Sequence, residues 1–288
     1  MARQSTAIVK NSAQAFGQIR NYLMAKQQAI ANIAPKYLDT ERMIRLALGA
    51  SSRAPRLLQC TPKSWLMALM DCAFYGLEPN PVLGHAYLIP FQNNKLDGRP
   101  YEVQFLAGYK GLILLATETG GFQDVEGRIV YEGEKFEEIP EDPMRPFRHR
   151  PRYDVDKDTP ILGAYAVGWR GPDQRPRFRF VPRPQIEEYR KRSRAAKSGP
   201  WVTDWNAMAM KTAARRMLAM ASMRPGSKLG AALDQESALD RGEVIRANEW
   251  QVGDDEPAEE PKSQTDQLAD ELAQKAAEPP APEPEFDA

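Results

Sequence analysis

Acidic residues are concentrated at the C-terminal end of this chain, and they limit how much of it can fold around a hydrophobic core. From Asp234 onward the sequence holds 17 acidic and 4 basic residues. Beyond Trp250 it consists mainly of Glu, Asp, Pro and Ala. A segment of this composition buries too little apolar surface to offset the entropy cost of ordering it. We therefore expect a folded body that ends near residue 233 and an acidic, largely disordered tail over residues 234–288.

The body is basic, although the formal net charge of the whole chain is zero. Residues 1–233 hold 35 basic and 22 acidic residues, and residues 170–228 alone hold 15 basic and 4 acidic ones. Positive charge at this density is typical of a site that binds a polyanion such as nucleic acid. The opposite charge of the tail leads to the hypothesis that it competes with that polyanion or docks a partner.

Helical patterns fill the first quarter of the chain. Residues 1–39 are polar with a helical apolar pattern, and we expect an arm that contacts a neighbouring subunit. Thr40 is expected to cap a second helix. In the third and clearest helix Thr61 is the N-cap, Pro62 opens the first turn and Gly76 ends the helix. The apolar side of that helix consists of Trp65, Leu66, Leu69, Met70, Cys72 and Ala73.

Strand patterns follow the helices. The predicted strands cover residues 86–91, 101–106, 125–131, 163–169 and 177–181. A short helix is expected between Gly108 and Thr119, and the Pro-rich residues 140–160 are expected to form a long surface loop. This mixture predicts an α+β fold with its core in residues 40–233, as one large domain or two closely packed lobes.

The last predicted strand and the helix after it carry many cations. Phe178 and Phe180 point to one face of that strand, while Arg177 and Arg179 point to the other. A helix that begins at Pro184 ends in a basic cluster. The candidate DNA-binding residues of that cluster are Arg190, Lys191, Arg192, Arg194 and Lys197. In the alternative interpretation, these cations match the helix dipole and solubilise the surface.

The segment from residue 199 to 220 combines tryptophans with cations. It contains Trp201 and Trp205, then a helix, with Thr203 or Asp204 as its N-cap, that carries Lys211, Arg215 and Arg216. Lys211 and Arg215 share one helix face because they are four residues apart. Such a segment suits stacking on bases and contact with phosphates. The alternative is a solvated helix face with the tryptophans in the core, and the sequence leaves both open.

The sequence gives little indication of ATP hydrolysis, nuclease activity or a membrane span. The phosphate-binding loop G-x-x-x-x-G-K-[ST] is absent, which argues against an ATP-driven motor. The E-x-K spacing of metal-dependent nucleases occurs only at Glu260, inside the acidic tail. Cys60 and Cys72 have the pattern of buried thiols in a reducing cytosol, and no apolar run is long enough to span a bilayer. We expect a soluble protein that binds nucleic acid without catalytic residues, metal or cofactor.

Four blocks of the sequence, taken in order, resemble the RecT family of phage single-strand annealing recombinases. They are LEPNPVLGHAYLIPF (residues 77–91), VQFLAGYKGLILLA (residues 103–116), the HRP of residues 149–151, and GPWVTDW with MKTAARR (residues 199–216). The resemblance covers roughly residues 40–220. The Pro-rich stretch of residues 138–160 differs from the family pattern, and its alignment with that pattern is not fixed.

The resemblance implies an ATP-independent protein that coats single-stranded DNA and pairs it with a complementary strand. It also implies a β-β-β-α core and assembly into rings or helical filaments in the bacterial cytoplasm. The expected partners are a phage exonuclease and the host single-stranded DNA-binding protein. Two other classes remain open: a passive single-stranded DNA-binding module, and a nuclease or accessory DNA enzyme with an unrecognised site.

Matched to the family blocks, site residues fall in a turn and in a helix. The turn contains Gly108, Tyr109, Lys110 and Gly111, and the helix block contains Gly199, Pro200, Trp201, Lys211, Arg215 and Arg216. From the residues themselves, the two glycines of the turn let a phosphate approach the backbone, while Lys110 adds charge. The alternative is an ordinary tight turn.

Overall fold

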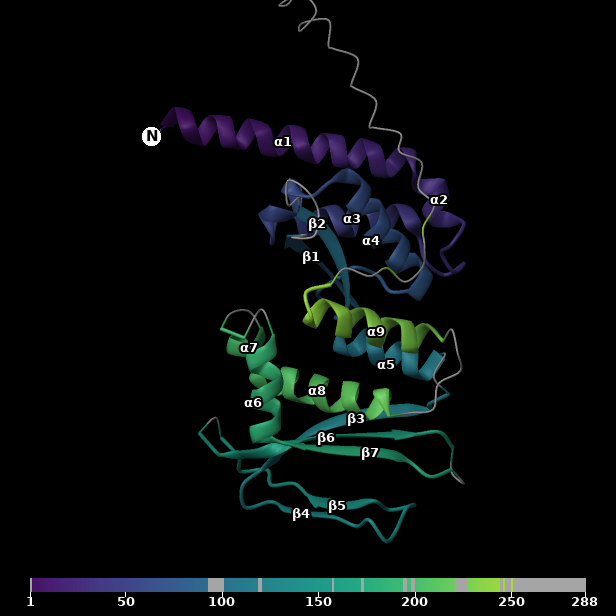
Figure 1. Ribbon diagram of the computed structural model, residues 1–288, viewed down its shortest axis with the longest axis vertical. Coiled ribbons are helices and arrows are strands. Elements are labelled where there is room, and N and C mark those ends of the chain that lie inside the picture. The colour runs from purple at the N-terminus through teal and green to yellow at the C-terminus, as the bar shows by residue number, and fades with distance from the viewer. Residues whose placement is uncertain are drawn as a thin grey trace, which may run out of the picture. The chain divides into compact units, whose positions relative to one another are not determined.

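The computed structural model describes most of the first 250 residues (Figure 1). The described residues are 2–92, 101–118, 121–156, 158–171, 174–193, 196–197, 200–220, 227–243, 246 and 250. They form a mixture of α-helices and antiparallel sheets, so the chain has an α+β fold. Within these residues, no helix has the length and apolar character needed to cross a membrane. Residues 93–100, between the first two predicted strands, and all residues from 251 onward lie outside the described part.

The N-terminal part is a group of helices that bury one apolar core. They are α1 (Ala2–Ala25), α2 (Gln27–Ala31), α3 (Thr40–Ala50), the 3₁₀ helix η1 (Pro55–Gln59) and α4 (Pro62–Tyr75). Helix α1 packs against α3 and α4, and its Ile19 and Leu23 are buried there. The predicted ends of α4 are confirmed: the Thr61 side chain accepts from the Ser64 N–H, and Gly76 has a left-handed φ of 75°. Helix α3 is capped by Asp39, which accepts from the Arg42 N–H, so the prediction that Thr40 is the cap is wrong.

Strands β1 (Ala86–Gln92) and β2 (Tyr101–Ala107) form an antiparallel pair that packs on α4. Side chains at alternate positions of β2, Val103 and Phe105, are buried against the helices. Helix α5 (Tyr109–Glu118) begins directly after β2. The sequence patterns predicted both strands and this helix to within two residues.

The second sheet has the strand order β3-β6-β7 and is antiparallel throughout. Its strands are β3 (Asp124–Tyr131), β6 (Ile161–Trp169) and β7 (Arg177–Pro182). The chain then continues through α6 (Arg183–Arg192), α7 (Pro200–Thr203) and α8 (Trp205–Ala219). Helix α8 covers one face of the sheet because small and apolar residues of both, such as Ala166 and Ala213, are fully buried in one core.

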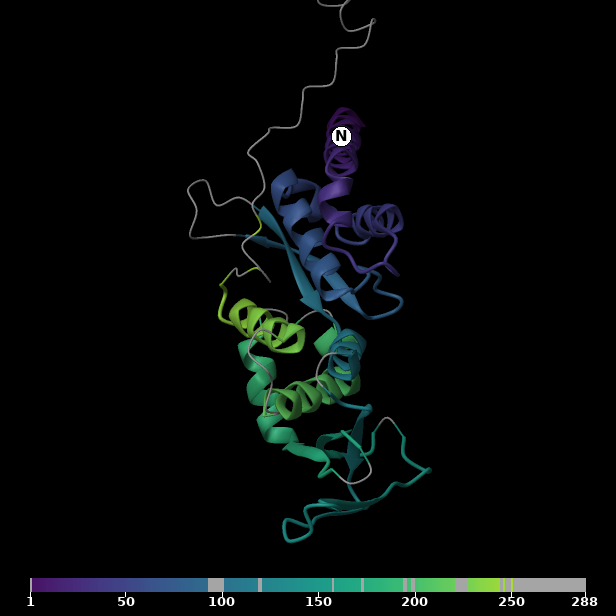
Figure 2. The ribbon, with the colours of Figure 1, turned by 90° about the vertical axis from the view of Figure 1, so that its right-hand side faces the viewer.

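The opposite face of this sheet is covered by a hairpin (Figures 1 and 2). Its strands are β4 (Lys135–Glu138) and β5 (Phe147–Arg150). Phe136 and Phe147 of the hairpin pack on Tyr165 and Phe178 of the sheet, with ring centroids 4.6 to 6.5 Å apart. The prediction of one long loop over residues 140–160 is therefore wrong for β5, because four residues there pair in register with β4.

Helix α9 (Lys228–Asp240) packs against α5, α8 and β2. It crosses residue 234, where the acidic tail was expected to begin, and its Gln235 and Glu236 are buried. The chain after α9 is also attached to the fold, since Trp250 Nε1 donates to Asp71 Oδ1 at 2.8 Å. Residues 234–240 are thus helical and buried on one side, and part of the negative charge counted in the tail lies against the basic body.

Candidate nucleic-acid interface

Strand β7 places two arginines on the same face of the sheet as α8. Phe178 and Phe180 point to the other face, where their ring centroids lie 4.6 Å from Phe147 and 4.8 Å from Phe136. Side chains alternate along a strand, so Arg177 and Arg179 lie opposite these phenylalanines. Both arginines are partly exposed. The alternation predicted for this strand is confirmed by the aromatic packing.

Two guanidiniums lie against the ring of Tyr189 in α6. The Cζ of Arg192 is 5.3 Å from the ring centroid, and the Cζ of Arg216, from α8, is 4.6 Å from it. Arg216 also donates a hydrogen bond to the Tyr189 hydroxyl. Because the ring attracts cations to its faces, Tyr189 holds both groups at the surface without neutralising their charge. Both arginines are exposed.

A second aromatic support lies at the start of α6. The Cζ of Arg183 is 5.6 Å from the Trp205 ring centroid. The indole Nε1 of Trp205 in turn donates to Glu187 Oε1 at 2.8 Å, which fixes the orientation of the ring. Trp205 is partly buried, so one side of it belongs to the core and the other supports an exposed arginine.

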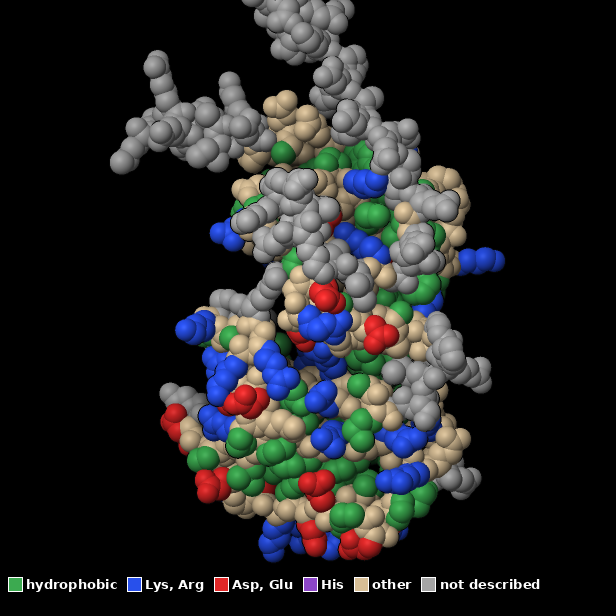
Figure 3. Space-filling model, in the orientation of Figure 1, with side chains coloured by type: hydrophobic (Ala, Val, Ile, Leu, Met, Phe, Trp, Pro, Cys, Tyr) green, Lys and Arg blue, Asp and Glu red, His purple; other side chains and the backbone are tan. Residues whose placement is uncertain are grey.

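These residues form one surface, which we call the cationic face. It consists of Arg177 and Arg179 of β7, Arg183, Tyr189 and Arg192 of α6, and Trp205 and Arg216 of α8. Figure 3 shows basic side chains gathered over α6, α8 and β7. Exposed guanidiniums supported by aromatic rings suit contact with the phosphates of a single strand.

The remaining predicted cations of the α6 region differ in their contacts with the rest of the protein. Lys191 Nζ lies 2.9 Å from Glu188 Oε1, and both side chains are well exposed. Arg190 Nε donates to the Ala196 carbonyl at 3.0 Å. Lys197 is exposed, and Arg194 lies outside the described residues. Helix α6 ends at Arg192, so Lys197 lies beyond the helix instead of belonging to it as predicted.

Lys211 and Arg215 of α8 are turned toward α9 and not toward solvent. Lys211 Nζ lies 2.6 Å from Glu236 Oε1 and donates to the Ala107 carbonyl at 3.2 Å. Arg215 Nη1 lies 2.6 Å from Asp240 Oδ2, and its Nη2 donates to Ser237 Oγ at 3.0 Å. The two cations share one helix face, as their spacing predicts, but they hold α8 to α9. The structure therefore gives them a stabilising role that the sequence pattern did not reveal.

Trp201 lies in the core. Its exposed fraction is 5%, and it belongs to the same apolar cluster as α8. The structure thus favours the second of the two interpretations left open above, in which this tryptophan packs inside. Asp204 is the N-cap of α8 and accepts from the Ala207 N–H at 3.1 Å.

The glycines of the turn before α5 allow close packing of the protein's own backbone. A Cβ on Gly108 would lie 2.0 Å from the Gly84 carbonyl oxygen, and one on Gly111 would lie 2.1 Å from the His85 carbonyl oxygen. The Gly108 N–H also donates to that His85 oxygen at 2.8 Å. The close approach inferred from these glycines is real, and the neighbour that it brings close is the loop before β1.

The two side chains between these glycines differ in exposure. Tyr109 is partly buried, and burial together with the carboxylate of Glu126 raises the pKa of its hydroxyl. Lys110 is exposed. Only Lys110 of this pair is presented to solvent as a cation.

The side chain of His149, from the HRP block, is only 4% exposed and is held by polar contacts inside the protein. Its Nε2 lies 3.0 Å from Glu134 Oε2, and its Nδ1 lies 3.3 Å from the Tyr165 hydroxyl. Glu134 also accepts from the N–H groups of Tyr131 and Arg152. This polar cluster fixes the β4–β5 hairpin to the sheet. Among the described residues, no three His, Cys, Asp or Glu side chains are grouped so as to hold a metal ion.

The sequence patterns did not predict that Tyr189 and Trp205 contact arginines. They also did not predict the carboxylates that pair with Lys211 and Arg215. Tyr189 and Arg192 are three residues apart in a helix, so their contact was accessible from spacing. Arg216 comes from another helix, and its place on Tyr189 depends on tertiary packing. The same holds for Glu236 and Asp240, which the sequence assigns only to an acidic tail.

Comparison with known proteins adds an independent observation. The model of the RecT family matches residues 41–248. The chain is 39% identical to Protein RecT of Escherichia coli (strain K12) over 215 residues, which is 74% of this chain and 77% of that protein. It is 25% identical to the uncharacterized protein YqaK of Bacillus subtilis (strain 168) over 213 residues, 73% of this chain and 69% of that one. The matched region runs from the start of α3 to beyond α9 and includes all the strands described above, and the chain belongs to the RecT family.

Proposed function

We propose that this protein binds single-stranded DNA and anneals it to a complementary strand without ATP, as the family resemblance implies. The observation that carries the proposal is the cationic face, where Tyr189 presents two exposed guanidiniums and β7 adds two more. Arginine contacts to phosphate hold the backbone of a strand and leave its base edges free. In this proposal Lys211 and Arg215 are not part of the primary surface, because their side chains form ion pairs with Glu236 and Asp240 of α9.

Annealing follows from this arrangement by simple electrostatics. A strand whose phosphates are paired with arginines repels a second strand less, because part of its charge is neutralised. The second strand then pairs through the free base edges. Base pairing itself supplies the free energy and the direction of the reaction, so nucleotide hydrolysis is unnecessary.

The proposal extends to the assembly. Strands β3, β6 and β7, with helix α8 packed on their sheet, are our candidate for the β-β-β-α core. Rings or helical filaments of the protein would place many cationic faces along one strand and let a second strand test its register. A phage exonuclease that exposes the strand and the host single-stranded DNA-binding protein are the proposed partners, in the cytoplasm of a bacterial host.

The test is an annealing assay with two complementary fluorescent oligonucleotides and no ATP. The expected result is faster duplex formation with protein than without, and tight binding of the single strand that weakens steeply with salt. Binding without acceleration would instead identify a passive single-stranded DNA-binding protein. Shortened strands after addition of Mg²⁺ would identify a nuclease.

A further inference from the structure

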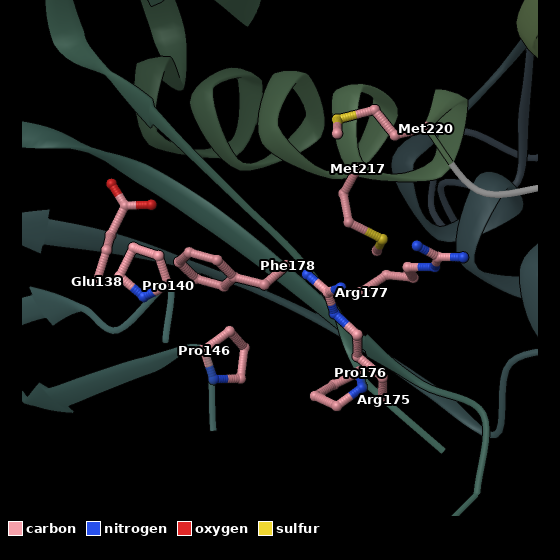
Figure 4. Close-up of a pocket in the computed structure, with 9 residues that line it drawn as sticks. All are labelled: Glu138, Pro140, Pro146, Arg175, Pro176, Arg177, Phe178, Met217 and Met220. Atoms are coloured by element: carbon pink, nitrogen blue, oxygen red, sulfur yellow. The ribbon is translucent and has the colours of Figure 1, made fainter. Parts of the chain in front are cut away.

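A hollow of about 190 Å³ lies beside the outer edge of β7, next to the cationic face (Figure 4). No described strand pairs with that edge. Met217 and Met220 at the end of α8 line one side of it, and Pro146 of the hairpin lines the other. Phe178, whose ring stacks on Phe147, also contributes to the wall. The walls are therefore apolar and polarisable, which suits a flat aromatic group.

Charged side chains line part of the hollow. Arg175 is exposed and Arg177 partly exposed, and among the described residues neither has an ion-pair partner. Figure 4 shows both arginine side chains among the residues that line the hollow. Arg177 also belongs to the cationic face, so the hollow is continuous with that surface. Glu138, at the end of β4, lines the hollow as well and supplies a single carboxylate.

An aromatic group beside a phosphate matches these walls and charges. We propose that the hollow holds one unstacked nucleobase of the bound strand, with the adjacent phosphate on Arg175 and Arg177. The base lies against Met220 and Phe178, and its amino edge faces Glu138, because a carboxylate accepts hydrogen bonds from base amino groups. This inference rests on the proposed function. It adds that the protein grips bases at intervals as well as the backbone.

Base stacking and phosphate contact are separable with two probes of equal charge. One probe is a short oligodeoxycytidine, and the other has the same number of phosphates but abasic sugars throughout. The measured quantity is the ratio of their dissociation constants for each protein variant. Because both probes are titrated against the same preparation, a variant that is partly unfolded changes both constants and leaves the ratio intact.

Met220→Ala is the diagnostic variant, because the Met220 side chain is 60% exposed and its removal leaves the core unchanged. The wild-type protein should bind the intact strand at least about 5-fold more tightly than the abasic one, as expected for stacking of one base. Met220→Ala should lower that ratio several-fold. Met144→Ala, which changes an exposed methionine outside the hollow, should keep it. Arg175→Gln should raise the dissociation constants of both probes by similar factors.

The outcomes separate this inference from the proposed function. A wild-type protein that binds both probes equally would overturn the base subsite while leaving single-strand binding in place. An unchanged ratio in Met220→Ala would also overturn the base subsite, because the preference for the intact strand would then arise outside the hollow. A protein that binds neither probe would overturn both proposals.

Discussion

Lys211 Nζ lies 2.6 Å from Glu236 Oε1, with only 13% and 6% of the two side chains exposed. This pair joins α8, in the most basic segment of the chain, to the first acidic residues of its C-terminal part. The charge of Lys211, which the sequence pattern indicates as a DNA contact, is therefore paired with a carboxylate of the protein itself.

We expect Lys211→Ala to destabilise the fold by up to about 3–5 kcal/mol, because it leaves the buried Glu236 with only the more distant Arg215 guanidinium, 3.7 Å from its Oε2, as a counter-ion. Urea unfolding followed by circular dichroism measures this. Lys191→Ala, which removes an exposed partner of Glu188, is the control and should leave the unfolding curve unchanged. If Lys211→Ala unfolds like wild type but loses DNA binding, then Lys211 acts at the interface and our assignment fails.

Tyr189 should matter for DNA binding through its ring. Tyr189→Leu removes the surface that orients Arg192 and Arg216, so single-strand affinity should fall at low salt. Tyr189→Phe keeps the ring and should retain most of the affinity.

Arg216→Ala should make the slope of log K against log[salt] shallower by about 0.7, the value for one phosphate of a single strand. Arg45→Ala, an exposed arginine of α3, should leave affinity and slope unchanged.

Trp201→Ala should act on stability. Removal of a buried tryptophan typically costs about 3–5 kcal/mol, so the melting temperature should drop markedly. The DNA affinity of the protein that remains folded should stay near the wild-type value. A variant with an unchanged melting temperature and an affinity lower by about 1–3 kcal/mol would show that the indole stacks on a base instead.

Gly108→Ala should destabilise the turn before α5, since the new Cβ would lie 2.0 Å from the Gly84 carbonyl oxygen and the backbone must shift. Gly49→Ala is the matched control. Gly49 is in helix α3, where an added Cβ would meet no atom within 4 Å, and the change should stabilise by up to about 1 kcal/mol. Equal effects of both substitutions in thermal melts would contradict the packing described for this turn.

Acid should weaken the attachment of the β4–β5 hairpin. Burial opposes ionisation of Glu134, but the N–H groups of Tyr131 and Arg152, together with His149, outweigh it and lower its pKa below the usual 4.5. A carboxyl with a lowered pKa stabilises the fold above its unfolded-state pKa, and this stabilisation is lost as the pH falls through the folded-state value.

The free energy of unfolding should therefore fall below about pH 4.5 more steeply in wild type than in Glu134→Gln, which cannot ionise. Urea titrations of both proteins from about pH 6 to about pH 3 measure the difference, and the other carboxyl groups cancel in the comparison. Identical pH profiles would show that the contacts of Glu134 do not lower its pKa in the folded protein.

The sequence by itself determined the local structure and the family. Thr61, Pro62 and Gly76 set the ends of α4 because capping and a left-handed φ depend on adjacent residues. The alternation of arginine and phenylalanine in β7 set which side chains share a face, since that period is local as well. Blocks of residues in order were enough to indicate the RecT family.

Only the tertiary structure decided which cations are free to bind a ligand. Lys211 and Arg216 are five residues apart in one helix, yet the first faces Glu236 of α9 and the second lies exposed on Tyr189 of α6. The pairing of β5 with β4 depends on a neighbouring strand, and the cap of α3 on a competing acceptor, the Asp39 carboxylate; periodicity weighs neither. The free energy of a charge depends on what packs around it. Elements distant in the sequence provide those surroundings, so local patterns identified the basic segment but not which of its cations are exposed.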